Sequence, residues 1–230
     1  MKLTKYFTKT ELIIWISSVI VIMTAFFVYD GVKYLNMIAS LIGTSALIFC
    51  AKGNPFGQVL IIIFASLYAY ISLSFKYYGE MITYLGMSLP MAVVALISWL
   101  KNPFKGSRAE VKVNTISKKE LIFAFGLSLV VTLVFYFILK ALGTANLVIS
   151  TVSITTSFLA AYLTFRRSEY FALAYALNDI VLIIMWIMAM TSSVEYISVV
   201  ICFIVFLVND TYSYINWSRM KKRQKEIEQD

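Results

Sequence analysis

The 230-residue sequence contains no histidine, only two cysteines and few charged residues, which make up 14% of the chain. The lack of histidine removes the commonest metal ligand and the commonest general base. Cys50 and Cys202 lie within apolar runs, where a thiol behaves as a small hydrophobe, and neither belongs to a Cys-x-x-Cys pattern. Phosphate-binding lysine, Gly-x-Ser-x-Gly and His-Glu-x-x-His motifs are also missing. We therefore expect no enzyme activity, no metal site and no cofactor.

Apolar residues dominate what is present. They make up 60% of the chain, and the mean hydropathy is +0.82. The apolar runs are close to the ~20 residues that a helix needs to cross a ~30 Å hydrocarbon core, whereas strands of a membrane barrel would alternate over ~10 residues. The sequence therefore predicts an all-α integral membrane protein, with spans at 12–29, 34–51, 56–74, 81–99, 121–141, 145–164, 170–190 and 196–216.

The net charge of +8 has two interpretations, nucleic-acid binding or membrane topology. Lys and Arg lie in short loops and at the two ends, which is typical of loops retained in the cytoplasm. We therefore expect no nucleic-acid partner, a bacterial inner-membrane location and both termini in the cytoplasm. With eight spans, one side of the membrane carries Lys2, Lys5, Lys9, Lys52, Lys101, Lys105, Arg108, Lys112, Lys118, Lys119, Arg166, Arg167, Arg219, Lys221, Lys222, Arg223 and Lys225.

The basic segment 101–120 divides the chain into two similar halves. In each half an Asn opens a span rich in Ser and Thr, and the last span of the half ends near a Trp, which is Trp99 or Trp217. This pattern predicts parallel three-helix repeats at 34–100 and 143–217, with an extra N-terminal helix in 1–33, a loop and linker helix in 101–142, and a basic cytoplasmic tail in 218–230. The alternative is that hydrophobic hairpins simply resemble one another.

Asp179 lies near the middle of the apolar span 170–190. A carboxylate at bilayer depth costs ~2.5–3.5 kcal/mol on insertion scales, so this side chain should face the bundle interior or a wet cavity. Tyr175, Asn178 and Trp186 share its helical face, which predicts a site for a flat, hydrogen-bonding small molecule. The competing interpretation is structural, with Asp179 bonded to Ser and Thr hydroxyls of the span 145–164 or held in its protonated form.

Other spans add polar candidates. Gln58 and Tyr68 are ten residues apart in the span 56–74 and so lie roughly on one face. Asn209 is expected to reach the interior, whereas Asp210 is expected to pair with a cytoplasmic Lys or Arg.

Several short stretches resemble one family when they are taken together. They are Tyr77-Tyr78-Gly79-Glu80, Leu89-Pro90-Met91, Ser98-Trp99-Leu100-Lys101, Arg166-Arg167, Asn178-Asp179-Ile180 and Asn209-Asp210. In this order and spacing, over about residues 34–217, they resemble the PnuC-type vitamin transporters.

The resemblance implies a SWEET-like 3+1+3 helical fold and facilitated uptake of a neutral, nucleoside-like vitamin precursor such as nicotinamide riboside. It also implies a homotrimer and a cytoplasmic kinase that traps the substrate by phosphorylation. The family's Trp-x-x-Trp followed by Asn aligns with Ala172, Tyr175 and Asp179, and a family Gln aligns with Tyr84. These departures leave a deoxynucleoside or a related nucleoside open as the substrate. The expected substrate-binding residues are Asp179, Asn178, Tyr175, Trp186, Asn209, Gln58, Tyr84 and Tyr68.

Two other functions remain open at this point. Asp179 could carry a proton in coupled transport. A membrane sensor or assembly subunit without transport activity would have a similar composition.

Overall fold

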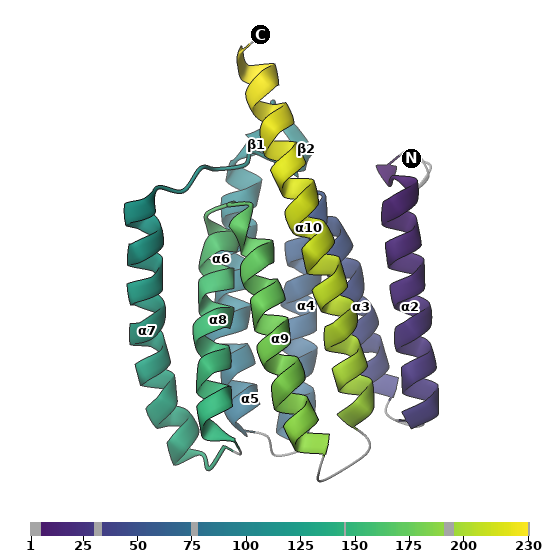
Figure 1. Ribbon diagram of the computed structural model, residues 1–230, viewed down its shortest axis with the longest axis vertical. Coiled ribbons are helices and arrows are strands. Elements are labelled where there is room, and N and C mark those ends of the chain that lie inside the picture. Colours follow the sequence, from purple (N-terminus) through teal and green to yellow (C-terminus); the bar gives the residue numbers. More distant parts are fainter. Residues whose placement is uncertain (1–5, 30–33, 75–77, 145, 191–195, 230) are drawn as a thin grey trace.

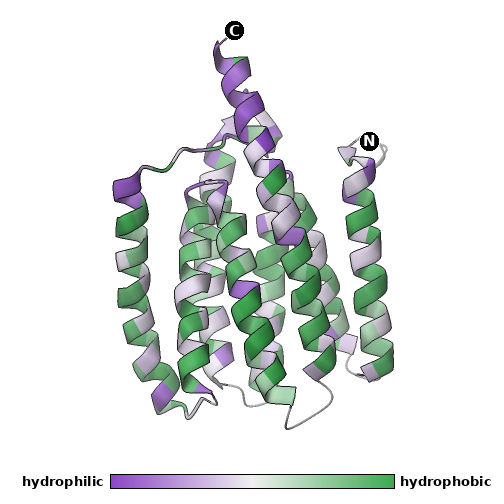
Figure 2. Ribbon diagram, in the orientation of Figure 1, coloured by the Kyte–Doolittle hydropathy of each residue, from purple (hydrophilic) through white to green (hydrophobic). Residues whose placement is uncertain are grey.

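A computed structural model describes residues 6–29, 34–74, 78–144, 146–190 and 196–229. It is an all-α bundle in which eight helical segments are long and apolar enough to cross a membrane. The first and last residues that the structure describes lie at the same end of the bundle, which we call the terminal end (Figure 1). Apolar residues cover most of the helices, and hydrophilic residues gather on the C-terminal part of α10 and the small hairpin beside it (Figure 2).

The expected spans are confirmed, with boundaries shifted by a few residues at most ends. One span is broken into α5, a π-helical turn η1 and α6. The last helix is much longer than expected, because residues 218–229 continue it instead of forming a separate tail. The elements are α2 Lys9–Tyr29, α3 Tyr34–Ala51, α4 Phe56–Ser74, α5 Tyr78–Thr83, η1 Tyr84–Ser88, α6 Leu89–Lys101, α7 Lys118–Ala141, α8 Leu147–Phe165, α9 Tyr170–Met190 and α10 Ile197–Gln229.

The break in the fourth span lies directly before Pro90. Proline has no backbone N–H and its ring crowds the preceding turn, so a π-helical turn is a common way to accommodate it. The wider turn brings Tyr84 and Met87 to the inner face of the bundle. This irregular turn therefore positions part of the cavity described below.

The helices form two groups of three. In the first, α3 and α4 pack together and α4 packs on α6; in the second, α8 packs on α9 and α9 on α10. The groups meet where α3 contacts α10 and where α6 contacts α8. Helix α7 packs on α8, and α2 packs on α3 and α10, so both lie outside the two groups (Figure 1).

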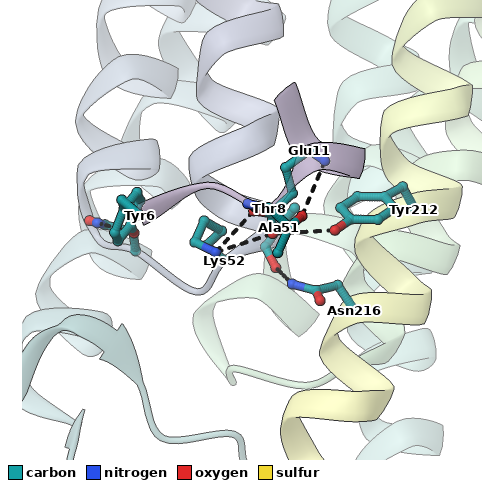
Figure 3. A network of polar contacts seen from close by, with 8 residues as sticks. Tyr6, Thr8, Glu11, Ala51, Lys52, Tyr212 and Asn216 are labelled. Atoms are coloured by element: carbon teal, nitrogen blue, oxygen red, sulfur yellow. Dashed lines mark hydrogen bonds and ion pairs between the residues drawn. The ribbon is translucent and has the colours of Figure 1, made fainter. Parts of the chain in front are cut away.

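A polar network anchors the extra helix α2 at the terminal end (Figure 3). The Glu11 side chain is only 1% exposed, and its carboxylate lies 3.1 Å from Lys52 Nζ and accepts a hydrogen bond from the Tyr212 hydroxyl at 3.2 Å. Glu11 also accepts from the backbone N–H of Thr8, while the Thr8 hydroxyl accepts from the backbone N–H of Glu11. This reciprocal arrangement is a capping box. The contacts of Glu11 with Lys52 and Tyr212 tie α2 to the end of α3 and to the middle of α10.

A two-stranded antiparallel hairpin lies at the same end, formed by β1 Pro103–Phe104 and β2 Ser107–Val111. The Gln224 side chain on the extended α10 accepts from the backbone N–H of Val113 at 2.8 Å and donates to the carbonyl of Val111 at 3.0 Å. Val111 is fully buried. The segment expected to be a basic loop is thus packed against the C-terminal helix.

Candidate substrate site

A cavity of about 490 Å³ lies between the two helix groups. Its size falls within the ~300–1,000 Å³ range of small-molecule pockets. It extends from Cys50 and Asp210 inside the bundle to Tyr78, Thr144 and Tyr196 at the end opposite the termini. Among the described residues, its lining includes neither Lys nor Arg.

Most of the predicted binding residues line this cavity. They come from three elements, namely α4 (Gln58, Tyr68), η1 (Tyr84) and α9 (Tyr175, Asn178, Asp179, Trp186). Helix α10 adds Asp210, which was not expected to bind substrate. The rings of Tyr68 and Tyr84 lie 5.3 Å apart between centroids, and Phe64 lies 4.6 Å from Tyr68. The structure therefore places an aromatic wall on the first helix group opposite the acid and amide of α9.

Asn178 both bonds its neighbouring helix and lines the cavity. Its Oδ1 accepts hydrogen bonds from the hydroxyls of Thr156 at 2.7 Å and Ser157 at 2.9 Å. The structural role considered for Asp179 therefore belongs to Asn178. Those contacts fix the orientation of the amide in the cavity wall.

Asp179 instead contacts a second acid, Asp210. The two carboxyl groups, on α9 and α10, are hydrogen-bonded to each other, and the side chains are 3% and 2% exposed. One oxygen of each, Asp179 Oδ2 and Asp210 Oδ1, is buried without a hydrogen-bond partner. The expected pairing of Asp210 with a cytoplasmic Lys or Arg is wrong, because the helix turns this side chain inward, one residue after Asn209.

Asn209 is not among the residues that line the cavity, so its predicted role in binding is not supported by its position. Its Nδ2 donates to the hydroxyl of Ser18 on α2 at 3.0 Å and to the carbonyl of Val205 at 2.8 Å. Adjacent helical residues are separated by about 100°, so Asn209 and Asp210 face different helices. Asn209 is 1% exposed and so lies in the interior as expected, on the side of α10 that faces α2.

Glu80 lines the cavity, although it lies just outside the span 81–99 expected from the sequence. It lies in α5, near the end of the cavity opposite the termini. The preceding Gly79 allows the start of α5 to lie against Thr144, because a Cβ at this position would be 2.4 Å from Thr144 Oγ1. The Tyr-Gly-Glu sequence could have indicated Glu80 as a cavity residue, since a small residue beside an acid at the end of a span indicates close packing next to a polar group.

Aromatic residues close the cavity toward the terminal end. Trp99 and Trp217 are fully buried with ring centroids 5.3 Å apart, and Phe171 lies 4.8 Å from Trp217. Val111 and Met220 join the same hydrophobic cluster. We call Trp99, Trp217 and Phe171 the aromatic floor.

Comparison with known proteins gives the family. Residues 33–219 match the family model described as "Nicotinamide mononucleotide transporter". The chain belongs to this family. The match covers both helix groups, α7 and the cavity, and it confirms the membership inferred from the short motifs.

The chain is also similar to two named relatives and to a solved structure. It is 30% identical over 215 residues to the nicotinamide riboside transporter PnuC of Neisseria mucosa, covering 91% of this chain and 81% of that protein. It is 24% identical over 213 residues to the PnuC of Haemophilus influenzae, covering 92% and 91% of the two chains. The crystal structure of the vitamin B3 transporter PnuC superposes with a TM-score of 0.82 at 27% identity, covering 95% of this chain and 94% of that one. The protein is therefore a multi-pass membrane transporter and not an enzyme.

Proposed function

We propose that this protein is a bacterial inner-membrane facilitator that takes up nicotinamide riboside or a nucleoside of similar shape. The observation that carries the proposal is a cavity of about 490 Å³ that combines aromatic rings, amides and carboxyls at membrane depth. The similar proteins of Neisseria mucosa and Haemophilus influenzae are nicotinamide riboside transporters, which supports the same substrate class.

The two ends of such a substrate differ in chemistry, and so do the walls of the cavity. Tyr68 and Tyr84 offer ring faces for stacking against a planar base, with Trp186 beside the mouth. Gln58 and Asn178 offer amide groups, and the free carboxyl oxygens accept hydrogen bonds from ribose hydroxyls. The base would therefore lie against α4 and η1 and the sugar against α9 and α10.

The charge of the lining selects further. The acidic and basic residues in the described lining are three acids, Glu80, Asp179 and Asp210, with no Lys or Arg. A phosphate group would therefore meet carboxyls without a cationic partner. A nucleotide is therefore disfavoured. Nicotinamide riboside carries a permanent positive charge on its pyridinium ring, and this acidic lining suits it better than the neutral substrate expected from sequence.

The transport cycle requires the cavity to open alternately on each side. The basic loops favour placing the terminal end in the cytoplasm, so this conformation would present its cavity toward the periplasm while the aromatic floor acts as the cytoplasmic gate. The two helix groups would rock against each other as three-helix repeats about the central site. Trapping by a cytoplasmic kinase and assembly into trimers stay predictions that rest on the family resemblance.

Uptake into proteoliposomes tests the proposal. Purified protein should catalyse counterflow of radiolabelled nicotinamide riboside, and Tyr175→Ala and Asp179→Ala should each reduce the rate at least about tenfold while the protein stays monodisperse in detergent. Substrate binding without flux would instead identify a membrane sensor. Unchanged counterflow in both variants would show that the site lies elsewhere.

A further inference from the structure

A chain segment that we call the strap, residues 103–116, crosses the terminal end of the bundle (Figure 1). It consists of the hairpin β1–β2 and the extended residues that follow it. The strap begins after α6, the last helix of the first group, and leads to α7, which packs on α8 of the second group. It therefore connects the two helix groups on the side of the aromatic floor, and a movement that separates the groups there has to displace it.

The strap is bonded at several points to the second helix group. The backbone N–H of Asn114 donates to the carbonyl of Arg167, in the turn between α8 and α9, at 2.9 Å. Arg167 Nε donates in return to the carbonyl of Lys112 at 3.2 Å. On α10, the Gln224 side chain bonds the backbone on both sides of Lys112. Because these bonds come from two separate elements, the strap should move together with α10 and the α8–α9 turn.

The strap meets the first helix group at the turn between α3 and α4. In the part of the chain that the structure describes, one hydrogen bond joins the strap to this turn, from the backbone N–H of Val111 to the carbonyl of Gly53 at 2.9 Å. A Cβ built on Gly53 would lie 3.0 Å from Met220 Cε and 3.3 Å from Val111 Cγ1. Gly53 also has a φ of +66°, which favours glycine. The strap and α10 thus approach this turn closely, but fewer hydrogen bonds hold the strap here than at the second group.

Val111 connects this contact with the aromatic floor. Its side chain is fully buried in the hydrophobic cluster that contains Trp99 of α6 and Trp217 of α10. Opening the cavity at the terminal end requires α10 to move away from α3 and α6. Since the strap is bonded to α10, that movement pulls Val111 away from Gly53.

We propose that the strap is a latch for the aromatic floor, closed when Val111 is bonded to Gly53 and open when this bond is broken. The strap leaves the α3–α4 turn each time the cavity opens at the terminal end, and it stays bonded to α10 and Arg167. This inference rests on the proposed function and adds a moving part to the gate. The latch consumes no energy, because it docks and undocks at equilibrium, as a facilitator requires. It also gives a function to residues 218–229 of α10, which extend beyond the expected span and carry Gln224.

Hydrogen exchange in the unmodified protein tests the latch without a substitution. Val111 is fully buried and Asn114 is partly exposed, so burial alone predicts slower exchange at the Val111 amide. The latch predicts the opposite order, because the Val111 N–H loses its partner when the strap undocks and the Asn114 N–H keeps its own. We expect the Val111 amide to exchange at least about tenfold faster than the Asn114 amide, after correction for intrinsic rates. Mass spectrometry with fragmentation to single residues measures both rates.

A reversible cross-link tests whether undocking is needed for transport. Gly53→Cys and Val111→Cys are combined in a Cys50→Ser, Cys202→Ala parent, which has no other thiol. The Cβ built on residue 53 is close enough to Val111 for a disulfide. In proteoliposomes, oxidation should reduce counterflow of radiolabelled nicotinamide riboside at least about tenfold, and reduction should restore it. The affinity of the oxidised protein in detergent should stay within about twofold, because the cavity and its opposite end are unchanged.

A cross-link within the second group is the matched control. Glu110 in the strap and Arg223 on α10 form an ion pair at 2.5 Å, and their side chains are 24% and 54% exposed. Glu110→Cys and Arg223→Cys, in the same parent, are joined with a short bifunctional thiol reagent. Because the strap and α10 move together, this cross-link should leave counterflow within about twofold of the rate before joining.

The outcomes separate this inference from the proposed function. Full counterflow in the oxidised Gly53→Cys, Val111→Cys protein, with the disulfide confirmed by mass, would overturn the latch and leave the facilitator intact. Loss of counterflow in the control cross-link would show that the strap has to move on α10, which also overturns the latch. A Val111 amide that exchanges no faster than the Asn114 amide would overturn it as well, and this measurement decides alone if the cysteine variants do not fold. Absence of counterflow in the unmodified protein would overturn the proposed function and this inference with it.

Discussion

Trp99 and Trp217 make equivalent hydrogen bonds in opposite directions between the two helix groups. Trp99 Nε1 donates to the carbonyl of Thr164 at the end of α8, and Trp217 Nε1 donates to the carbonyl of Cys50 at the end of α3, at 2.9 and 2.8 Å. The preceding residues repeat the arrangement, because Ser98 donates to the carbonyl of Phe165 and Asn216 to the carbonyl of Ala51, both at 2.8 Å. The last helix of each group thus caps the first helix of the other group: α6 caps the end of α8, and α10 caps the end of α3.

These reciprocal hydrogen bonds predict that the two tryptophans hold the aromatic floor closed. Trp99→Phe or Trp217→Phe keeps a ring but leaves a helix-terminal carbonyl without its donor, which costs about 1–3 kcal/mol. In a Cys202→Ala background, Cys50 in the cavity becomes a reporter. A membrane-impermeant thiol reagent applied from the terminal side should label Cys50 about 5- to 150-fold faster in either variant.

Trp15→Phe is the matched control for that experiment. Its indole donates to the Ser45 hydroxyl at 3.2 Å, on a contact between α2 and α3 away from the floor. Equal labelling rates in Trp15→Phe, Trp99→Phe and the Cys202→Ala parent protein would show that the aromatic floor is not a gate.

The reciprocal tryptophans also show what the sequence could predict. Trp99 and Trp217 end corresponding spans, and this spacing predicted two similar groups of three helices. Their hydrogen bonds were not visible, because the partners are backbone carbonyls about 65 and 167 residues away. Hydropathy predicts spans because a single segment must satisfy the bilayer, but it does not predict which helix ends meet.

The same limit applies to the candidate site. Asp179 was identifiable from sequence because a carboxyl in an apolar span stands out. Its partner Asp210 was assigned to a Lys or Arg because it lies in the last two turns of the expected span 196–216, close to the basic tail, and nothing local shows which way its side chain points. Which group a buried acid contacts depends on how the helices pack and on the rotation of each helix about its axis.

Gln58 and Asn209 are both buried amides, but we expect different roles for them. Gln58 lines the cavity, whereas Asn209 bonds α2 through Ser18. We expect Gln58→Leu to weaken nicotinamide riboside binding at least fivefold, since one neutral hydrogen bond is worth about 1 kcal/mol. Asn209→Leu should lower the melting temperature and leave the dissociation constant within twofold. Calorimetry and thermal unfolding measure the two effects, and the reverse pattern would show that the cavity is not the binding site.

The Glu11 network predicts a large loss of stability from a conservative change. Glu11→Gln removes the charge opposite Lys52 and replaces an acceptor oxygen by a donor facing Lys52 and Tyr212 (Figure 3). Breaking one side of a buried ion pair costs about 3–5 kcal/mol, so the melting temperature in detergent should fall by several degrees. Glu228→Gln, at an ion pair whose side chains are 54% and 43% exposed, should change it by less than a degree or two.

Gln224 predicts that the C-terminal helix stabilises the hairpin at the terminal end. Its side chain bonds the backbone of Val113 and Val111 and donates to Glu110 at 2.7 Å, so Gln224→Ala leaves two buried backbone groups without partners. The expected cost is about 1–3 kcal/mol for each unsatisfied group. Protease cleavage within residues 103–117 should become at least tenfold faster, while Lys225→Ala, at an exposed position one residue further along α10, should leave it unchanged. Equal protection in both variants would mean that packing of Val111 against Trp99 and Met220 holds the hairpin without the help of α10's amide.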